Sequence, residues 1–265
     1  RYFIEPINSA TMDNTKVGII GYGVVGRAIA NAFEKKYNLV KYDKYVNYDD
    51  FSSLSNCDTV FISVPTPFDC ENSSVDDSAI TEALSNLENI NFKGIVIIKS
   101  TIPPGSIANY IKKFNLSLVY NPEFLRESTT PNEDFANQTC IVIGTENEEV
   151  YKFVKLLYQK VAVSNAEYHK VTPLEAEMIK YAQNTMLASR VALANIIHDA
   201  CDEHSISYDI IRKLAFDDLE LLGPHMVQVP GPDGNKGFGG KCLPKDIMGF
   251  STIHNNEVFY LHAKE

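Results

Sequence analysis

The sequence predicts an α/β protein in which a doubly wound parallel sheet is followed by a long central helix and a small all-helical domain. Three observations predict this fold class. Short apolar runs alternate with helical stretches between residues 17 and 163, a pattern typical of parallel sheets covered by helices. A glycine-rich turn joins the first apolar run to the first helical stretch. No glycine or proline interrupts the chain between Pro173 and Gly223, so a long helix can form there.

The first predicted strand, residues 17–20, leads directly into a turn with the spacing GxGxxG, and a helix is expected over residues 24–36. In this pattern the first glycine makes the turn, the second admits a pyrophosphate, and the third lets the helix pack on the strand. The phosphates would lie at the helix N-terminus. The alternative is an ordinary glycine-rich turn of a parallel sheet. The residues assigned to this site are Gly21, Gly23, Val24, Val25 and Gly26.

An acidic residue follows at the position that such a site requires. A second strand is expected over residues 38–42, and it ends at Asp43, which lies 22 residues after Gly21. Asp43 would accept hydrogen bonds from the adenosine ribose and would repel a 2′-phosphate, so NAD is favoured over NADP as the cofactor. The neighbouring Lys44 weakens that preference slightly.

The alternation continues to residue 163. Because ligands of doubly wound sheets bind beyond the carboxyl ends of the strands, the polar loops at 65–67, 100–105 and 121–127 are expected to gather there. Further strands are expected at residues 58–64, 95–99, 116–120, 140–144 and 161–163, and further helices at residues 75–87, 105–114 and 146–159.

The second half of the chain begins with a helix-capping pattern. Thr172 would cap the helix, Pro173 is tolerated at its first position, and Glu175 completes a capping box. A helix over residues 173–203 would be about 45 Å long, which suits a link between domains or a dimer interface. A shorter helix is expected over residues 208–216. Lys180 and Asn184 are four apart and share one face of the long helix, where the alternative to a functional role is a solvated polar stripe.

A glycine-rich loop over residues 237–246 contains a cysteine with polar neighbours. Cys242 lies between Lys241 and Lys245 in the sequence, and nearby cations favour a thiolate. Asp246 can hold a partner or a water molecule. Such a cysteine suits nucleophilic attack on a carbonyl, whereas the alternative is a buried, purely structural cysteine.

Composition excludes several classes of function. The formal net charge of −10 argues against a surface that binds nucleic acid. The five cysteines are odd in number and have neither disulfide nor metal spacing, so a reduced, cytoplasmic protein without a metal is expected. We expect no membrane association, because no apolar run approaches the ~20 residues that span a bilayer and no signal peptide opens the chain. Residues 1–11 precede Met12 and are interpreted as a tag remnant or an extension.

The motifs together resemble the nucleotide-sugar 6-dehydrogenases, the UDP-glucose and GDP-mannose dehydrogenase family. They occur in the family's order over residues 17–250, and the cysteine motif is the most specific of them. The matching segments are Gly21–Gly26 with Asp43, residues 64–67, Ser100-Thr101, residues 121–127, residues 175–185 and residues 238–246. The resemblance implies a Rossmann-type NAD-binding domain over residues 12–172. A central helical and dimerisation domain with the cysteine loop would then cover residues 173–265.

The resemblance also implies a reaction, in which two hydride transfers to NAD convert the C6 alcohol of a nucleotide sugar to an acid. Cys242 would add to the aldehyde and later carry a thioester. Lys180 would stabilise the oxyanion or share its proton, Asn184 would orient substrate oxygens, and Glu123 would be the base for thioester hydrolysis. Asp246 and Thr101 would position the water that acts as base. Thr66, Thr101, Glu127 and Lys245 would lie along the nicotinamide half of NAD. Substrate contacts are implied for Glu123, Phe124, Leu125, Arg126, Glu127, Lys180, Asn184, Gly231, Asn235 and Gly239.

UDP-glucose is the favoured substrate, because residues 229–234 resemble the loop that members acting on UDP-sugars place against the substrate. The alternative for that segment is an ordinary Pro/Gly turn. Family members carry a C-terminal domain, which we expect to be absent here because the chain stops at Glu265.

Three alternative functions stay open. The first is a dehydrogenase for another UDP- or GDP-sugar, and the second is a truncated NAD-binding protein without full turnover. The third is a related hydroxyacid dehydrogenase, which would share the Rossmann-type domain and the long helix. Cys242 counts against this third alternative, because two-electron chemistry needs no catalytic cysteine.

Overall fold

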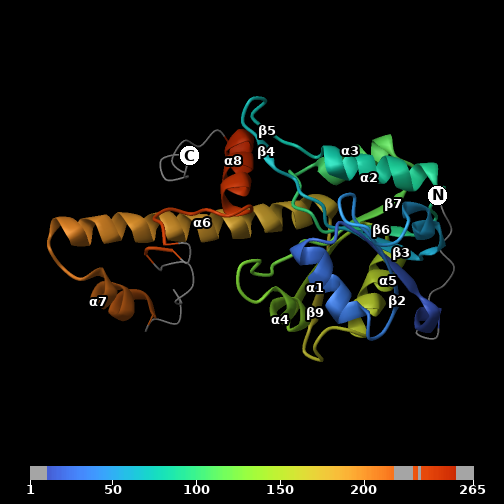
Figure 1. Ribbon diagram of the computed structural model, residues 1–265, viewed down its shortest axis with the longest axis horizontal. Coiled ribbons are helices and arrows are strands. Elements are labelled where there is room, and N and C mark those ends of the chain that lie inside the picture. Colours follow the sequence, from blue (N-terminus) through green and yellow to red (C-terminus); the bar gives the residue numbers. More distant parts are fainter. Residues whose placement is uncertain (1–10, 218–228, 232–233, 255–265) are drawn as a thin grey trace. The chain divides into compact units, whose positions relative to one another are not determined.

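The chain forms two compact units in the computed structural model, which describes residues 11–217, 229–231 and 234–254 (Figure 1). Residues 11–66 and 76–180 form the N-terminal unit. The second unit comprises residues 67–75 and the described residues from Tyr181 onward. Apart from residue 11, the predicted tag or extension lies outside the described residues. No helix in the described ranges combines the length and the apolar character that crossing a bilayer requires.

The N-terminal unit is built on a seven-stranded sheet in the order β2-β1-β3-β6-β7-β8-β9. The strands from β2 to β7 in this order are parallel, so the predicted doubly wound sheet is confirmed for them. The last two strands are parallel to each other but antiparallel to β7, which the sequence did not predict. The strands are β1 Lys16–Ile20, β2 Asn38–Tyr42, β3 Thr59–Ile62, β6 Ile95–Ile98, β7 Ser117–Tyr120, β8 Cys140–Gly144 and β9 Glu167–Val171.

The strand predicted at residues 161–163 is wrong. The amide groups of Val161 and Ala162 donate to the carbonyl of Tyr158 at 3.0 and 2.8 Å, so these residues close the end of the preceding helix. The strand lies instead at Glu167–Val171, on the edge of the sheet, where its side chains are exposed or half-buried. An edge strand with exposed side chains needs no apolar residues. The sequence GluTyrHisLysVal therefore lacks the apolar pattern that predicts a buried strand.

Helices cover both faces of this sheet (Figure 1). On one face, α1 and α5 pack in a core that includes Ile29, Phe33 and Leu157. On the other face, α2 and α3 contribute Leu84 and Ile107 to a second core. The ends of α1, α2, α3 and α5 differ from the predicted ends by up to three residues, and α4 was not predicted. The helices are α1 Val24–Phe33, α2 Ser78–Asn89, α3 Ser106–Lys113, α4 Pro131–Ala136 and α5 Glu148–Gln159, with 3₁₀ turns at Thr11–Asn14 and Phe51–Asn56.

The predicted long helix, α6, runs over Pro173–Glu203, and its capping box is present. The carboxylate of Glu175 accepts from the Thr172 amide at 2.7 Å, and the Glu175 amide donates to the Thr172 hydroxyl at 3.2 Å. The α6 residues up to Lys180 belong to the N-terminal unit and the rest to the second unit.

Shorter elements form the rest of the second unit within the described residues. The helix predicted at residues 208–216 is α7, Tyr208–Arg212, followed by a π-helical turn at Lys213–Asp217. Helix α8, Leu243–His254, contacts a hairpin of two-residue strands, β4 and β5 (Figure 1). This hairpin, Phe68–Asp69 with Ser74–Val75, replaces the start of the helix predicted at residue 75.

Candidate active site

The glycine turn between β1 and α1 has the geometry of a phosphate-binding turn. Gly21 has a φ of 87°, and a Cβ there would lie 2.5 Å from the Ser63 carbonyl oxygen. A Cβ at Gly26 would lie 2.0 Å from the Gly21 carbonyl oxygen, so helix and turn approach too closely for a side chain. Around Gly23, in contrast, nothing lies within 4 Å of that position. No side chain caps the first turn of α1, which leaves its amide groups able to bind an anion.

Asp43 lies beside this turn. The Gly21 amide donates to the Tyr42 carbonyl at 2.9 Å, which joins the turn to the end of β2. The Asp43 carboxylate accepts from the amides of Tyr22 and Tyr45 at 2.8 and 2.9 Å. A carboxylate has further lone pairs, so Asp43 can still accept from a ligand hydroxyl. The Lys44 ammonium group contacts the Glu82 carboxylate at 2.8 Å.

Two loops predicted to meet at the carboxyl ends of the strands are joined in the structure. The Thr66 hydroxyl, after β3, donates to the Thr101 carbonyl, after β6, at 2.7 Å. The Ser100 hydroxyl donates to the Val64 carbonyl at the same distance. Thr66 and Thr101, both predicted to face the nicotinamide half of NAD, are therefore neighbours.

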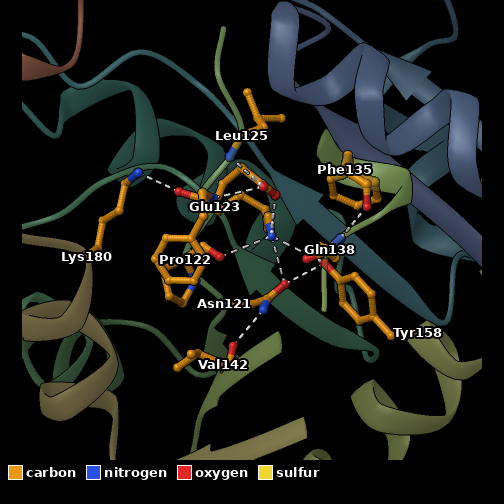
Figure 2. A network of polar contacts seen from close by, with 11 residues as sticks. Asn121, Pro122, Glu123, Leu125, Phe135, Gln138, Val142, Tyr158 and Lys180 are labelled. Carbon is orange, nitrogen blue, oxygen red and sulfur yellow. Dashed lines mark hydrogen bonds and ion pairs between the residues drawn. The ribbon is translucent and has the colours of Figure 1, made fainter. Parts of the chain in front are cut away.

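Glu123, in the loop after β7, is buried and firmly held. One carboxylate oxygen, Oε1, accepts from the amides of Phe124 and Leu125 at 2.9 and 3.2 Å. The other, Oε2, lies 2.9 Å from the Lys99 ammonium group, whose side chain has no exposed surface. Figure 2 shows Glu123 in a polar network with Asn121 and Tyr158. Lys99 is a site residue that the sequence analysis missed, and a charged residue in the strand predicted at residues 95–99 was the available signal.

Lys180 and Glu123 are brought together. The Lys180 ammonium group donates to the Glu123 main-chain carbonyl at 2.5 Å and lies 5.6 Å from the centre of the Phe124 ring (Figure 2). Both residues are buried. Two predicted catalytic residues therefore meet within the N-terminal unit, at the carboxyl edge of the sheet that carries the glycine turn.

The rest of this loop is more exposed. The Arg126 guanidinium forms a two-pronged contact with Asp134 at 2.7 and 2.8 Å, which holds the pKa of that carboxyl well below its usual range. Arg126 was predicted to bind substrate, but here its hydrogen-bonding edge is turned to Asp134. Glu127 is exposed, whereas Leu125 packs against the sheet core.

In the second unit, Cys242 directly precedes α8. Its carbonyl accepts from the Asp246 amide at 2.9 Å, so Cys242 lies at the N-terminus of that helix, where the backbone dipole favours an anionic sulfur. Cys242 is half-buried. Cys57, in contrast, is buried, and burial raises the pKa of its thiol to about 11. All five cysteines are free thiols.

Asp246 is fully buried and contacts the side chains of two other predicted residues. It accepts a hydrogen bond from the Asn184 side chain and contacts the Lys245 ammonium group at 2.5 Å. Asn184 lies on α6, so Asp246 ties the cysteine loop to that helix within the second unit. Lys245 was predicted to lie along NAD, and in the structure its charge is paired with Asp246.

Part of the predicted substrate loop is also described. The Gly231 amide donates to the Asn235 carbonyl at 2.8 Å, and the amide of Gly237 donates to the Asn195 side chain at 3.2 Å. Gly239 is exposed, next to the buried Phe238. Residues 225–228 and 232–233 of that segment lie outside the described residues.

One cluster in the described ranges has metal-binding side chains. The ligand atoms of His198, Asp199 and Asp202 lie within 4.8 Å of one another. The Lys236 ammonium group contacts Asp199 at 2.5 Å and Asp202 at 4.0 Å. Because this cation already balances the carboxylates, we assign no metal role to the cluster.

Two family models match most of the chain. Residues 38–162 match the NAD binding domain of the UDP-glucose/GDP-mannose dehydrogenase family, and residues 174–262 match the central domain of the same family.

Individual proteins are similar as well. The UDP-glucose 6-dehydrogenase of Rickettsia felis is 32% identical over 77% of this chain and 45% of its own length. The enzyme of the same name from Campylobacter jejuni is 34% identical over 76% of this chain and 51% of its own. The chain thus spans about half the length of these relatives.

Solved structures share the fold. A UDP-glucose dehydrogenase from Pyrobaculum islandicum has a TM-score of 0.79 and 24% identity, covering 92% of this chain and 65% of that one. A UDP-D-ManNAc dehydrogenase from Pyrococcus horikoshii has a TM-score of 0.77 and 20% identity, covering 91% and 65%.

Proposed function

The chain belongs to the UDP-glucose/GDP-mannose dehydrogenase family, and we propose that it oxidises the C6 alcohol of UDP-glucose to the uronic acid. The observation that carries the proposal is the hydrogen bond from the Lys180 ammonium group to the Glu123 main-chain carbonyl. It lies at the carboxyl edge of the same sheet that carries the glycine turn. The buried Glu123 carboxylate and the buried Lys180 ammonium group would act as acid–base groups at the carboxyl ends of the parallel strands.

NAD is the cofactor of this family, and the residues of the glycine turn fit it. The open space at Gly23 and the uncapped amides of α1 would hold the pyrophosphate, and Asp43 would hold the adenosine ribose. The joined loops at Thr66 and Thr101 would lie along the nicotinamide. Bound NAD supplies the acceptor for the hydride that leaves C6 in each oxidation.

Cys242 supplies the covalent step of the proposal. Its thiolate attacks the aldehyde carbon formed by the first oxidation, and the adduct keeps this reactive intermediate from leaving. The second oxidation turns the thiohemiacetal into a thioester. Lys180 would stabilise the oxygen that becomes negative in these steps. The hydrogen bond between Asn184 and Asp246 supports a shared role for these two residues in orienting the substrate oxygens or a water molecule.

The choice of UDP-glucose rests on the names of relatives and on the loop over residues 229–234. Relatives at 32–34% identity are called UDP-glucose 6-dehydrogenases, whereas a neighbour with the same fold is a UDP-D-ManNAc dehydrogenase. Another UDP- or GDP-sugar with a free C6 hydroxyl is therefore the second candidate. We also propose that the protein forms a homodimer through α6.

The stoichiometry of the reaction tests the proposal. The purified protein, as the 265-residue chain and in any longer native form, is incubated with NAD and one sugar nucleotide at a time. We expect two NADH per UDP-glucose consumed and little reaction with UDP-N-acetylmannosamine or GDP-mannose. A ratio of one would indicate an ordinary two-electron dehydrogenase. NAD binding without turnover in either form would favour a protein that works by binding alone.

A further inference from the structure

Lys99 is a buried cation to which the proposed reaction gives no role. It follows β6 at the centre of the sheet, and its side chain has no exposed surface. Burial lowers the pKa of its ammonium group, because a charge without water is unfavourable there. A methionine would fill a similar volume at this position without that penalty. The presence of a lysine therefore calls for an explanation in its contacts.

The contacts of Lys99 form a built polar site. Its ammonium group donates to the Asn121 side-chain oxygen at 2.9 Å and to the Tyr158 hydroxyl at 3.3 Å. The Tyr158 hydroxyl in turn donates to the same Asn121 oxygen at 2.6 Å. Asn121 is itself fixed, because its amide donates to the Val142 carbonyl at 2.6 Å (Figure 2). The ring centres of Phe135 and Tyr158 lie 5.6 and 5.8 Å from the ammonium nitrogen.

The network ends at one functional atom, Oε2 of Glu123. Lys99 contacts it at 2.9 Å as an ion pair, while the remaining oxygen of the carboxylate is held by two main-chain amides. Lys180 donates to the main-chain carbonyl of the same residue. Lys99 is therefore a side-chain cation in direct contact with the Glu123 carboxylate.

We propose that Lys99 is a positioning residue for the hydrolysis of the thioester, because it holds the Glu123 carboxylate in a fixed orientation. The inference rests on the proposed function. In that step, Glu123 takes a proton from water as the water oxygen attacks the thioester carbonyl carbon. The carbon–sulfur bond then breaks, the acid leaves, and the sulfur of Cys242 departs as the thiolate. General base catalysis needs the accepting oxygen within hydrogen-bond reach of the attacking water, and the contacts of Lys99 and of the two main-chain amides fix where the Glu123 oxygens lie.

In the proposed mechanism Glu123 acts as the base in the hydrolysis, whereas the two oxidations need it less. Measuring the oxidations and the hydrolysis separately therefore distinguishes a loss of the base from general damage to the protein. Lys99→Met removes the charge and keeps most of the volume. Mixed rapidly with NAD and UDP-glucose, this variant should release two NADH per Cys242 in a burst and then turn over about 30-fold more slowly or worse, since a base contributes about 10²–10⁴-fold. The intact protein should gain the mass of the acyl group, as it should in Glu123→Gln.

Two further variants keep the test decisive if Lys99→Met folds poorly. Tyr158→Phe removes only the hydroxyl that touches Lys99 and Asn121, and it should slow hydrolysis by roughly 3- to 10-fold while the burst is retained. Lys99→Met/Glu123→Gln removes both charges of the pair and should unfold at a higher urea concentration than Lys99→Met alone. Lys170→Met is the matched control, because Lys170 forms an exposed ion pair with Glu148. It should hydrolyse the thioester at the parental rate.

The outcomes distinguish this inference from the proposed function. If the parent forms uronic acid and both Lys99→Met and Tyr158→Phe hydrolyse the thioester at the parental rate, Lys99 is only structural and the inference is wrong. Equal slowing of the oxidations and the hydrolysis would also overturn it, since general damage to the fold gives that result. A parent that forms no acid in any native form contradicts the proposed function and this inference together.

Discussion

Cys242 offers a test of the covalent mechanism at a single atom. It is half-buried at the start of α8, so replacing its sulfur with oxygen disturbs little packing. Cys242→Ser should bind NAD normally and fall by about a thousandfold or more in uronic acid formation, roughly 4 kcal/mol of barrier, because a serine hydroxyl keeps its proton at neutral pH. Acid formation measured by chromatography checks this. Turnover at the parental rate would show that Cys242 is structural.

We predict that Asp43 and Lys44 determine the preference for NAD over NADP. The Lys44 charge is paired with Glu82, so Asp43 should dominate and a 2′-phosphate should be repelled. NADP should therefore bind at least tenfold more weakly than NAD, which corresponds to 1.4 kcal/mol. Asp43→Asn should narrow this gap, and Glu82→Gln should narrow it a further two- to fivefold by leaving Lys44 without its partner. Fluorescence titration gives both constants, with Glu149→Gln as control. Equal binding of the two cofactors by the parent would refute the role of Asp43.

The site residues predicted from the sequence, such as Cys242, Glu123 and Lys180, have nucleophilic or ionisable side chains. The structure joins Glu123 to Lys180 and Thr66 to Thr101. Lys99 was missed because pairing across the sheet, from β6 to the loop after β7, is not encoded in local spacing. The ion pair between Lys245 and Asp246 was not predicted, for a different reason. Sequence proximity alone does not say whether a cation will face its neighbour or a ligand.

At the scale of elements, apolar patterning predicted the buried strands and the partly buried β2, and it failed at β9 and at the β4–β5 hairpin. Strands β1, β3, β6 and β7 are largely or fully buried and lie within two residues of their predicted bounds. The edge strand β9 has no apolar run, and the hairpin β4–β5 has strands of only two residues, too short for a period to appear. The long helix α6 was found because its capping box and its lack of glycine and proline are both local signals.

Glu177 on α6 caps the N-terminus of α3 within the N-terminal unit and so supports the loop after β6. The amides of Gly105 and Ile107, at the start of α3, donate to the two carboxylate oxygens of Glu177 on α6 at 2.5 and 2.8 Å. Glu177→Gln keeps one acceptor but turns an N–H donor toward the other amide. It should destabilise the protein by about 1–3 kcal/mol at pH 7, measured by urea unfolding. A change below a few tenths of a kcal/mol would show that α3 needs no such cap.

The stability gap between the parent and this variant should depend on pH. Burial raises the pKa of the Glu177 carboxyl above its ordinary value, despite the two amide donors. The folded state therefore binds the proton more tightly than the unfolded state, so this residue's contribution falls as pH rises above 4.5. The gap should narrow from pH 4.5 to pH 8. Glu175→Gln is the contrast, since the Thr172 hydrogen bonds lower the pKa of the exposed Glu175, and its contribution should fall as pH drops. A gap that widens with pH for Glu177→Gln would contradict this assignment.

At the scale of the whole molecule, the described chain divides into two units, each with part of the proposed machinery. The N-terminal unit contains the glycine turn and the Glu123–Lys180 pair, and the second contains Cys242 with Asp246 and Asn184. Helix α6 belongs to both. The parallel part of the sheet in the N-terminal unit was predictable, because strands that alternate with helices along the chain are typical of a parallel, doubly wound sheet. A homodimer through α6 stays a prediction, which rests on the exposed apolar face of that helix.

That face of α6 leads to the last prediction. Met186, Leu193 and Ile196 are 64%, 56% and 48% exposed. With Ala182, Ser189 and Ala200 they form a stripe whose spacing alternates between four and three residues, as in helices that pack side by side. A second copy of α6 would bury this stripe, so the protein should be a homodimer by light scattering at micromolar concentration.

Charges on the stripe should abolish that dimer. In Met186→Glu/Leu193→Glu, each carboxylate would lose its water at the contact, and like charges from two copies would repel each other. The variant should sediment as a folded monomer with unchanged NAD binding, because the glycine turn lies in the N-terminal unit. Ile111→Glu, on the equally exposed surface of α3, should stay dimeric. A monomeric parent would refute the dimer, and a dimeric double variant would place its interface on another surface.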